Sequence, residues 1–104
     1  MLGINYIGVS IPENYKPFIE RYDTILDFIR DAIELSHDFL IYSRIKTDDI
    51  DGEVVLYKGC LLDARIVVNG EELRGIRAWA VLEDLGEKGS VEAVIYRLKP
   101  VSID

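Results

Sequence analysis

The chain has 104 residues, a length that suits one domain and leaves little room for a second. Hydrophobic residues make up 49% and charged residues 30%, so we expect a packed core and exclude a disordered chain. The 12 Lys and Arg residues against 19 Asp and Glu residues give a net charge of -7. This balance argues against binding to nucleic acid or to an anionic membrane surface.

The single cysteine, Cys60, excludes an intrachain disulfide and a cysteine-based zinc site. No apolar run reaches the roughly 18 residues of a membrane span, and the N-terminus lacks a signal-peptide pattern. We therefore expect a cytoplasmic protein without a metal or cofactor. The chain has no glutamine, one Met and one Cys beside many charged residues, a composition typical of a thermophilic source.

The first third of the chain predicts a strand and a helix. Apolar alternation predicts an extended strand over residues 2–11, followed by a loop over residues 12–17. Residues 18–35 place apolar side chains on one side of a helix and charged side chains on the other. A break near Tyr22 is an alternative, because Asp23 could cap a second, shorter helix.

Three strands are expected in the middle of the chain, over residues 39–46, 53–58 and 61–68. The last two flank Lys58-Gly59, which predicts a tight hairpin because glycine adopts a positive φ at little cost. Residues 47–52 are expected to form a polar connection. Asn69-Gly70 predicts a second turn, one that leads out of the sheet.

Residues 71–85 predict a second helix with apolar side chains around almost its whole circumference. Such a helix is buried on more than one side or meets a second subunit. A strand over residues 76–82 is the alternative. After a turn at residues 86–89, residues 91–98 are expected to form the closing strand.

These elements follow the order β-α-β-β-β-α-β, which predicts an α+β fold, an antiparallel β-sheet with two helices on one face. The prediction assigns residues 1–98 to a single domain and residues 99–104 to a tail or linker. With such a tail, the chain is compatible with the N-terminal module of a longer protein.

The acidic stretch at Asp48, Asp49 and Asp51 has part of the spacing of a calcium loop. With Gly52 at the sixth position of that motif, the first position is threonine and the twelfth is lysine, so the bidentate carboxylate is missing. We expect a solvated acidic turn and no metal site.

His37 and Cys60 are the two remaining candidates for catalysis. His37 follows the first predicted helix, where capping or exposure is the usual role. Nucleophilic catalysis would require it beside Ser36, Ser43, Cys60 or another activated group, together with a third orienting residue. Only Lys58 could lower the pKa of the Cys60 thiol, so we expect an inert, partly buried cysteine. The glycines match neither the dinucleotide-binding nor the P-loop spacing.

Arg74 and Arg77 are three residues apart and could bind an acidic ligand or partner. The favoured interpretation is that they form exposed ion pairs with residues such as Glu71 or Glu83.

The apolar surplus of the second helix predicts an interface anchored by Trp79, with Ile76 and Val81 beside it. The leading hypothesis is a non-catalytic protein–protein interaction or regulatory module that self-associates as a homodimer. The protein partner is not identified by the sequence.

Two other hypotheses remain open. One is a small-molecule-sensing domain with an aromatic-lined pocket. Its lining residues would be Tyr42, Tyr57, Tyr96 and Arg65 or Arg77. The other is an enzyme that uses paired carboxylates, although no spacing in the chain supports such a pair.

The run GEVVLYKGCLLDA from Gly52 to Ala64, with Gly59 at its turn, resembles part of a known domain family, as do the expected helix over residues 76–85 and the run GSVEA over residues 89–93. The family is a domain of unknown function attached to bacterial response regulators and gliding-motility proteins, with archaeal relatives. The resemblance covers residues 52–98, about half the chain. It implies a signalling or assembly module without known catalytic residues. Residues 1–15 have no counterpart in it.

Overall fold

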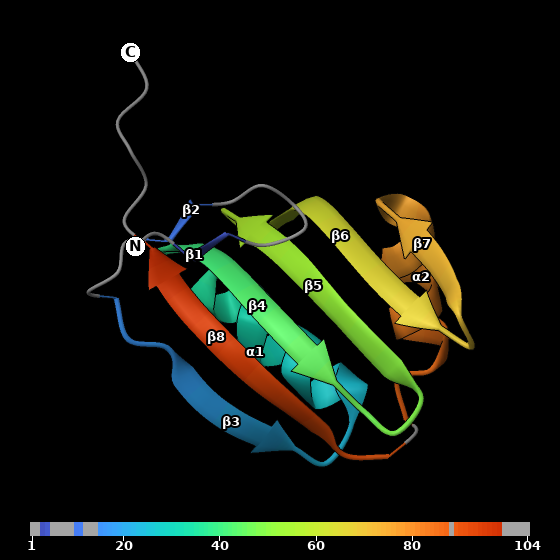
Figure 1. The fold of residues 1–104 in the computed structure, drawn as a ribbon. Helices are drawn as coiled ribbons and strands as arrows, with labels where there is room; N and C mark the ends of the chain where they lie inside the picture. The colour runs from blue at the N-terminus through green and yellow to red at the C-terminus, as the bar shows by residue number, and fades with distance from the viewer. Residues whose placement is uncertain (1–2, 5–9, 12–14, 88, 99–104) are drawn as a thin grey trace.

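Six strands form one antiparallel sheet in the computed structural model, which describes residues 3–4, 10–11, 15–87 and 89–98 (Figure 1). The strand order is β3-β8-β4-β5-β6-β7, and every neighbouring pair is antiparallel. The strands are β3 (Phe18–Tyr22), β4 (Leu40–Lys46), β5 (Ile50–Tyr57), β6 (Cys60–Val68), β7 (Glu71–Arg74) and β8 (Val91–Leu98).

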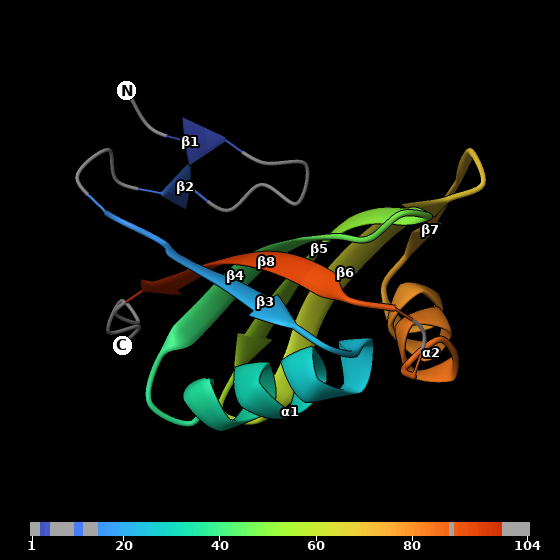
Figure 2. The same ribbon diagram turned by 90° about the horizontal axis from the view of Figure 1, so that it is seen from below.

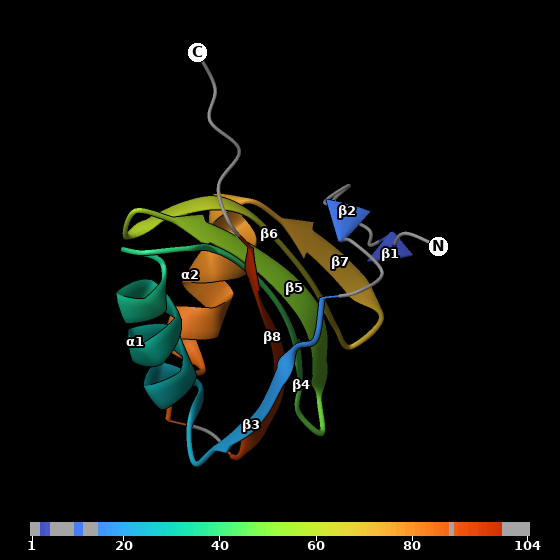
Figure 3. The same ribbon diagram turned by 90° about the vertical axis from the view of Figure 1, so that its left-hand side faces the viewer.

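Helices α1 (Ile25–Leu35) and α2 (Ile76–Asp84) cover one face of this sheet, which curves around them (Figure 2, Figure 3). The main core lies between the sheet and the helices, where Phe28, Ala78 and Leu82 meet strand residues such as Val54 and Ile66. The predicted α+β class is confirmed. The order in the six-stranded sheet and its helices is β-α-β-β-β-β-α-β, which has one strand more than expected.

Helix α1 begins later than the sequence predicts. The side chain of Thr24 caps it by accepting a hydrogen bond from the backbone N–H of Asp27 at 3.1 Å. The five residues of β3 pair with β8 as an edge strand, and Asp23 and Thr24 lead from it into the helix, so the expected helix over residues 18–35 is wrong for residues 18–24. Five residues satisfy both a helical and a strand pattern, and the exposed edge of β8 decides between them.

The N-terminal segment reverses direction instead of forming one extended strand. β1 (Gly3–Ile4) pairs antiparallel with β2 (Ser10–Ile11), and the two lie on the sheet face opposite the helices (Figure 2, Figure 3). The rest of the expected strand, residues 12–14 of the expected loop, and the expected tail at residues 99–104 lie outside the described residues.

The three central strands are confirmed, but β5 begins at Ile50, so the expected polar connection is shorter. The hairpin between β5 and β6 turns on two residues with positive φ, Lys58 at 52° and Gly59 at 76°. A β-bulge between Val55 and Leu56 shifts the register of this pair.

Asn69 and Gly70 form a second two-residue hairpin turn, with φ values of 53° and 78°. This turn leads into β7, which pairs with β6, so the expectation that it leaves the sheet is wrong. The predicted second helix is confirmed only from Ile76 onward, because its first four residues are β7. The alternative strand over residues 76–82 is wrong, whereas the closing strand β8 has the predicted bounds.

No helix in the part of the chain that the structure describes is long and apolar enough to cross a bilayer.

Candidate functional site

The sheet face opposite the helices carries its side chains in rows that run across the strands, because paired residues of antiparallel strands share a face. The first charged row alternates in sign. It runs through Arg21, Glu92, Lys46 and Asp51, and continues across β6 and β7 to Val67 and Glu72.

The second charged row lies beside the first. Its members, in order across the sheet, are Ile19, Val94, Arg44, Glu53, Arg65 and Arg74. Beyond it the face becomes apolar over β8, β4 and β5, with Tyr96, Tyr42 and Val55 in the third row and Leu98 beside Leu40 in the fourth. On β6 the third row ends at the half-buried Asp63.

The apolar end of this face is covered by the N-terminal segment. Ile11 of β2 is buried there with Tyr42, Val55 and Leu98. Tyr15 packs against the same cluster. The two charged rows therefore form the more open part of the face.

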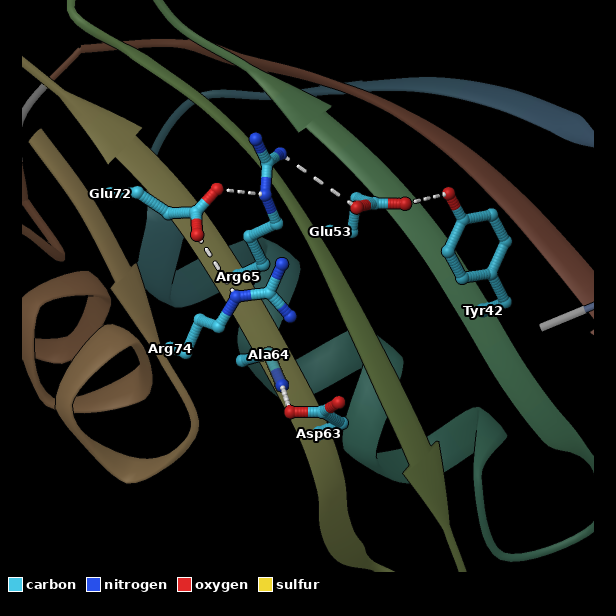
Figure 4. A network of polar contacts seen from close by, with 7 residues as sticks. All are labelled: Tyr42, Glu53, Asp63, Ala64, Arg65, Glu72 and Arg74. Atoms are coloured by element: carbon cyan, nitrogen blue, oxygen red, sulfur yellow. Dashed lines mark hydrogen bonds and ion pairs between the residues drawn. The ribbon is translucent and has the colours of Figure 1, made fainter. Parts of the chain in front are cut away.

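A chain of polar contacts crosses the second charged row (Figure 4). The hydroxyl of Tyr42 donates a hydrogen bond to Oε1 of Glu53 at 2.5 Å, and Nη1 of Arg65 lies 3.9 Å from Oε2 of the same carboxylate. Nε of Arg65 donates to Glu72 at 2.6 Å, and Nε of Arg74 donates to the other oxygen of Glu72 at 3.0 Å. We call these five residues the polar network. It joins β4, β5, β6 and β7.

Burial and the hydrogen bond to Glu53 raise the pKa of the Tyr42 hydroxyl. The phenol therefore stays protonated and acts as a donor. At the exposed end, hydrogen bonds from Arg74 and Arg65 hold the pKa of Glu72 below its ordinary value. The polar groups of the network contact one another, so we assign the network a structural role in aligning the four strands.

An open hollow of about 300 Å³ lies over the charged rows. Its walls are Arg44, Lys46, Asp51, Glu92, Val94 and Tyr96, with Ile45 below. A second hollow, of about 360 Å³, lies at one end of the molecule, between the turn at residues 47–49, Asn69 and the loop before β8.

The acidic turn beside the second hollow is organised by Thr47. Its hydroxyl oxygen accepts hydrogen bonds from the backbone N–H groups of Asp49 at 3.1 Å and Ile50 at 3.0 Å. Among the described residues, no group of three or more His, Cys, Asp or Glu side chains could hold a metal ion.

Ser36 joins α1 to the β5–β6 hairpin, a contact that the sequence did not predict. Its buried hydroxyl donates to the carbonyl of Ile33 at 2.6 Å and accepts from the backbone N–H of Gly59 at 2.9 Å. The backbone N–H of Lys58 also donates to the Ser36 carbonyl at 2.6 Å. A buried polar residue at a helix end is the signal that could have indicated this contact.

Among the described residues, His37 and Cys60 form no hydrogen bond with each other. The exposed His37 ring lies against Gly59, 3.0 Å from where a Cβ at that glycine would stand. Cys60 is exposed, so the expected partial burial is wrong; it stands at the start of β6, directly after the turn.

The three predicted interface residues lie on different sides of α2. Ile76 points away from the core and is 79% exposed. Trp79 and Val81 are half-buried and pack against the main core. At 100° per residue Trp79 adjoins Ile76, whereas Val81 lies on the opposite flank of the helix.

A further exposed apolar side chain lies in β6, the strand beside which α2 starts. Leu62, 58% exposed, stands in the bulged part of β6. The backbone N–H of Gly75 donates to the carbonyl of Ala64 at 2.8 Å, which brings the start of α2 to this part of β6. We call Ile76, Leu62 and Trp79 the α2 surface.

The predicted tyrosine pocket is divided by the fold. Tyr42 is buried in the apolar cluster, Tyr57 is half-buried and lies outside it, and Tyr96 borders the 300 Å³ hollow. Arg65 belongs to the polar network, while Arg77 is on α2, on the other side of the sheet. Arg74 pairs with Glu72, so the expected pairing with Glu71 or Glu83 is wrong for this residue.

Comparison with protein-family models, curated proteins and solved structures finds no match for this chain. The resemblance of residues 52–98 to the domain attached to response regulators stays a prediction. The cytoplasmic location and the thermophilic source stay predictions too.

Proposed function

We propose that this domain is a non-catalytic protein-interaction module that self-associates through the α2 surface. The observation that carries the proposal is the exposure of Ile76, whose side chain is 79% accessible at the start of α2. Single exposed apolar residues are common on protein surfaces. Here the half-buried Trp79 adjoins Ile76 on the helix, and Leu62 is exposed in the neighbouring strand β6, so the apolar surface at this side of the molecule extends beyond one residue.

The occupant we propose is a second copy of the chain, because the exposed side of α2 is self-complementary. Its polar residues are Arg77 near the N-terminal end and Glu83 and Asp84 at the C-terminal end, all exposed. In an antiparallel twofold pairing of two α2 helices centred on Ala80, Arg77 of each copy would face Glu83 of the other, and Ile76 would pack beside Asp84 of the other. The small, exposed Ala80 would lie near the axis, where it allows close approach.

Sedimentation velocity on two matched variants tests this proposal. Ile76→Glu places a carboxylate beside Asp84 of the other copy and should shift the dimer towards monomer by at least about tenfold in dissociation constant. Ile19→Glu is the control, since Ile19 is 70% exposed on β3 at the far edge of the sheet, and its dimerisation should match the parent.

A parent protein that remains monomeric at the highest concentration reached would contradict the proposal. So would loss of the dimer in Ile19→Glu with retention in Ile76→Glu, because that result would move the interface to β3.

The non-catalytic part of the proposal is supported by the polar network, whose carboxylates accept contacts from Tyr42, Arg65 and Arg74. The regulatory role is supported only by the resemblance of residues 52–98.

A further inference from the structure

Arg44 is a cation without a carboxylate at ion-pair distance among the described residues. It stands between Val94 and Glu53 in the second charged row. Glu53 is directed elsewhere, because its two oxygens accept the Tyr42 hydroxyl and face Arg65. The guanidinium of Arg44 is exposed on the open part of the face.

Among the described residues next to Arg44, one positive charge is uncompensated. In the neighbouring first row, Arg21 pairs with Glu92 at 3.0 Å, and Lys46 stands opposite both Asp51 and Glu92. These four residues are two cations and two anions, so their formal charges cancel. In the second row, Glu53 is matched by Arg65, and Arg74 is paired with Glu72.

The hollow of about 300 Å³ opens directly over Arg44. Val94 and the ring of Tyr96 form its apolar side, and Lys46 borders it on the other. The site thus combines one fork-shaped cation with apolar walls, in a volume at the small end of ordinary ligand pockets.

We propose that this hollow binds a small monocarboxylic acid with an apolar tail, its carboxylate on the Arg44 guanidinium and its tail against Val94 and Tyr96. A guanidinium and a carboxylate form two parallel charge-assisted hydrogen bonds, and one negative charge balances the one that Arg44 leaves uncompensated. This inference is independent of self-association, since the hollow is on the sheet face opposite α2.

The same electrostatics favours a monocarboxylate over phosphate. Asp51 and Glu92 border the hollow, so a dianion would bring more negative charge to the site than Arg44 offsets. Lys46 cannot supply the difference, because both of its cross-strand neighbours are those carboxylates.

NMR spectroscopy tests the proposal: phenylacetate is titrated into the protein, and the chemical shifts of the backbone amides are measured at each step. We expect shifts concentrated at residues 44, 46, 94 and 96. Phenylacetamide has nearly the same shape but no charge, and should bind at least about tenfold more weakly. Inorganic phosphate should bind more weakly than phenylacetate.

Three variants complete the test. Arg44→Gln should weaken phenylacetate binding at least about tenfold. Arg44→Lys keeps the charge but loses the forked guanidinium, so its affinity for phenylacetate should lie between those of the parent and of Arg44→Gln. Arg30→Gln, a matched loss of an exposed arginine on α1, should bind like the parent.

Equal binding of phenylacetate and phenylacetamide, unchanged binding by Arg44→Gln, or tighter binding of phosphate would each overturn the proposal. Absence of shifts at these residues up to the solubility limit of phenylacetate would overturn it as well.

Discussion

Glu53 lies almost completely buried, 1% exposed, on a sheet face rather than in the core between sheet and helices. Removing a carboxylate from water costs several kcal/mol unless partners compensate it. Tyr42 supplies a hydrogen bond and Arg65 supplies charge. Because these partners come from β4 and β6, the buried carboxylate favours one alignment of three adjacent strands.

The contribution of the Tyr42 hydroxyl can be measured by Tyr42→Phe. This variant removes one partner of a buried carboxylate, so the free energy of unfolding should fall by about 1 to 3 kcal/mol in urea denaturation. Tyr96→Phe is the control, since the half-buried Tyr96 hydroxyl has no hydrogen bond within the described part of the chain. Equal losses in the two variants would show that the hydroxyl of Tyr42 contributes nothing specific.

Glu72 predicts how stability depends on acid. Its pKa is lowered from 4.5 in the folded state, because Arg74 and Arg65 donate hydrogen bonds to its charged form. A lowered pKa stabilises the fold above the unfolded value, and this contribution is lost as the pH falls below 4.5 through the folded pKa. The effect is small because the pair is exposed to solvent.

The free energy of unfolding, measured by urea denaturation, should therefore fall less steeply with decreasing pH below 4.5 for Glu72→Gln than for the parent. Glu71→Gln is the matched control, an exposed neighbour without an ion pair among the described residues. A Glu72→Gln profile parallel to that of the parent would contradict the assignment.

At the scale of elements, Ser36 holds the C-terminal end of α1 against the β5–β6 hairpin. Ser36→Ala would leave the backbone N–H of Gly59 without its acceptor, so we expect a loss of about 1 to 3 kcal/mol in thermal or urea unfolding. Ser43→Ala is the control, because Ser43 is equally buried but its hydroxyl only reaches the adjacent Arg44 carbonyl at 3.3 Å. A loss no larger than that of the control would refute the role of Ser36.

The elements that the sequence predicted correctly are those whose periodicity is long and whose turns are local. β8 and the strands around Gly59 belong to this group, as does most of α1. β3 and β7 were assigned to helices because each is short and sits at an edge of the sheet. β3 is a strand because it pairs with β8, which lies far away in the chain. β7 is a strand because it pairs with β6, and its four residues are too few to show a strand pattern of their own.

The polar network could not be predicted for a related reason. Counting outward from the Lys58-Gly59 turn without interruption places Glu53 opposite Ala64. The bulge at Val55 and Leu56 adds one residue to β6 and brings Arg65 opposite Glu53 instead. The exposure of Leu62 has the same origin, so one of the three residues of the α2 surface could not be predicted from the sequence, whereas the helical positions of Ile76 and Trp79 could.

At the scale of the whole molecule, charge is unevenly distributed between the two helices. α1 and its flanking turns carry one cation, Arg30, against several carboxylates. These carboxylates are Asp23, Asp27, Asp31, Glu34 and Asp38. Two copies that met through α1 would repel each other, whereas α2 combines Arg77 with two acidic residues and an exposed isoleucine. This asymmetry favours α2 as the self-associating side.

Sedimentation equilibrium of the unaltered chain over a wide concentration series tests self-association most directly. We expect the weight-average mass to rise with concentration from 11.8 kDa towards twice that value, as a reversible twofold dimer requires. A mass that stays at 11.8 kDa at every concentration would contradict the assignment of the α2 surface as an interface between copies.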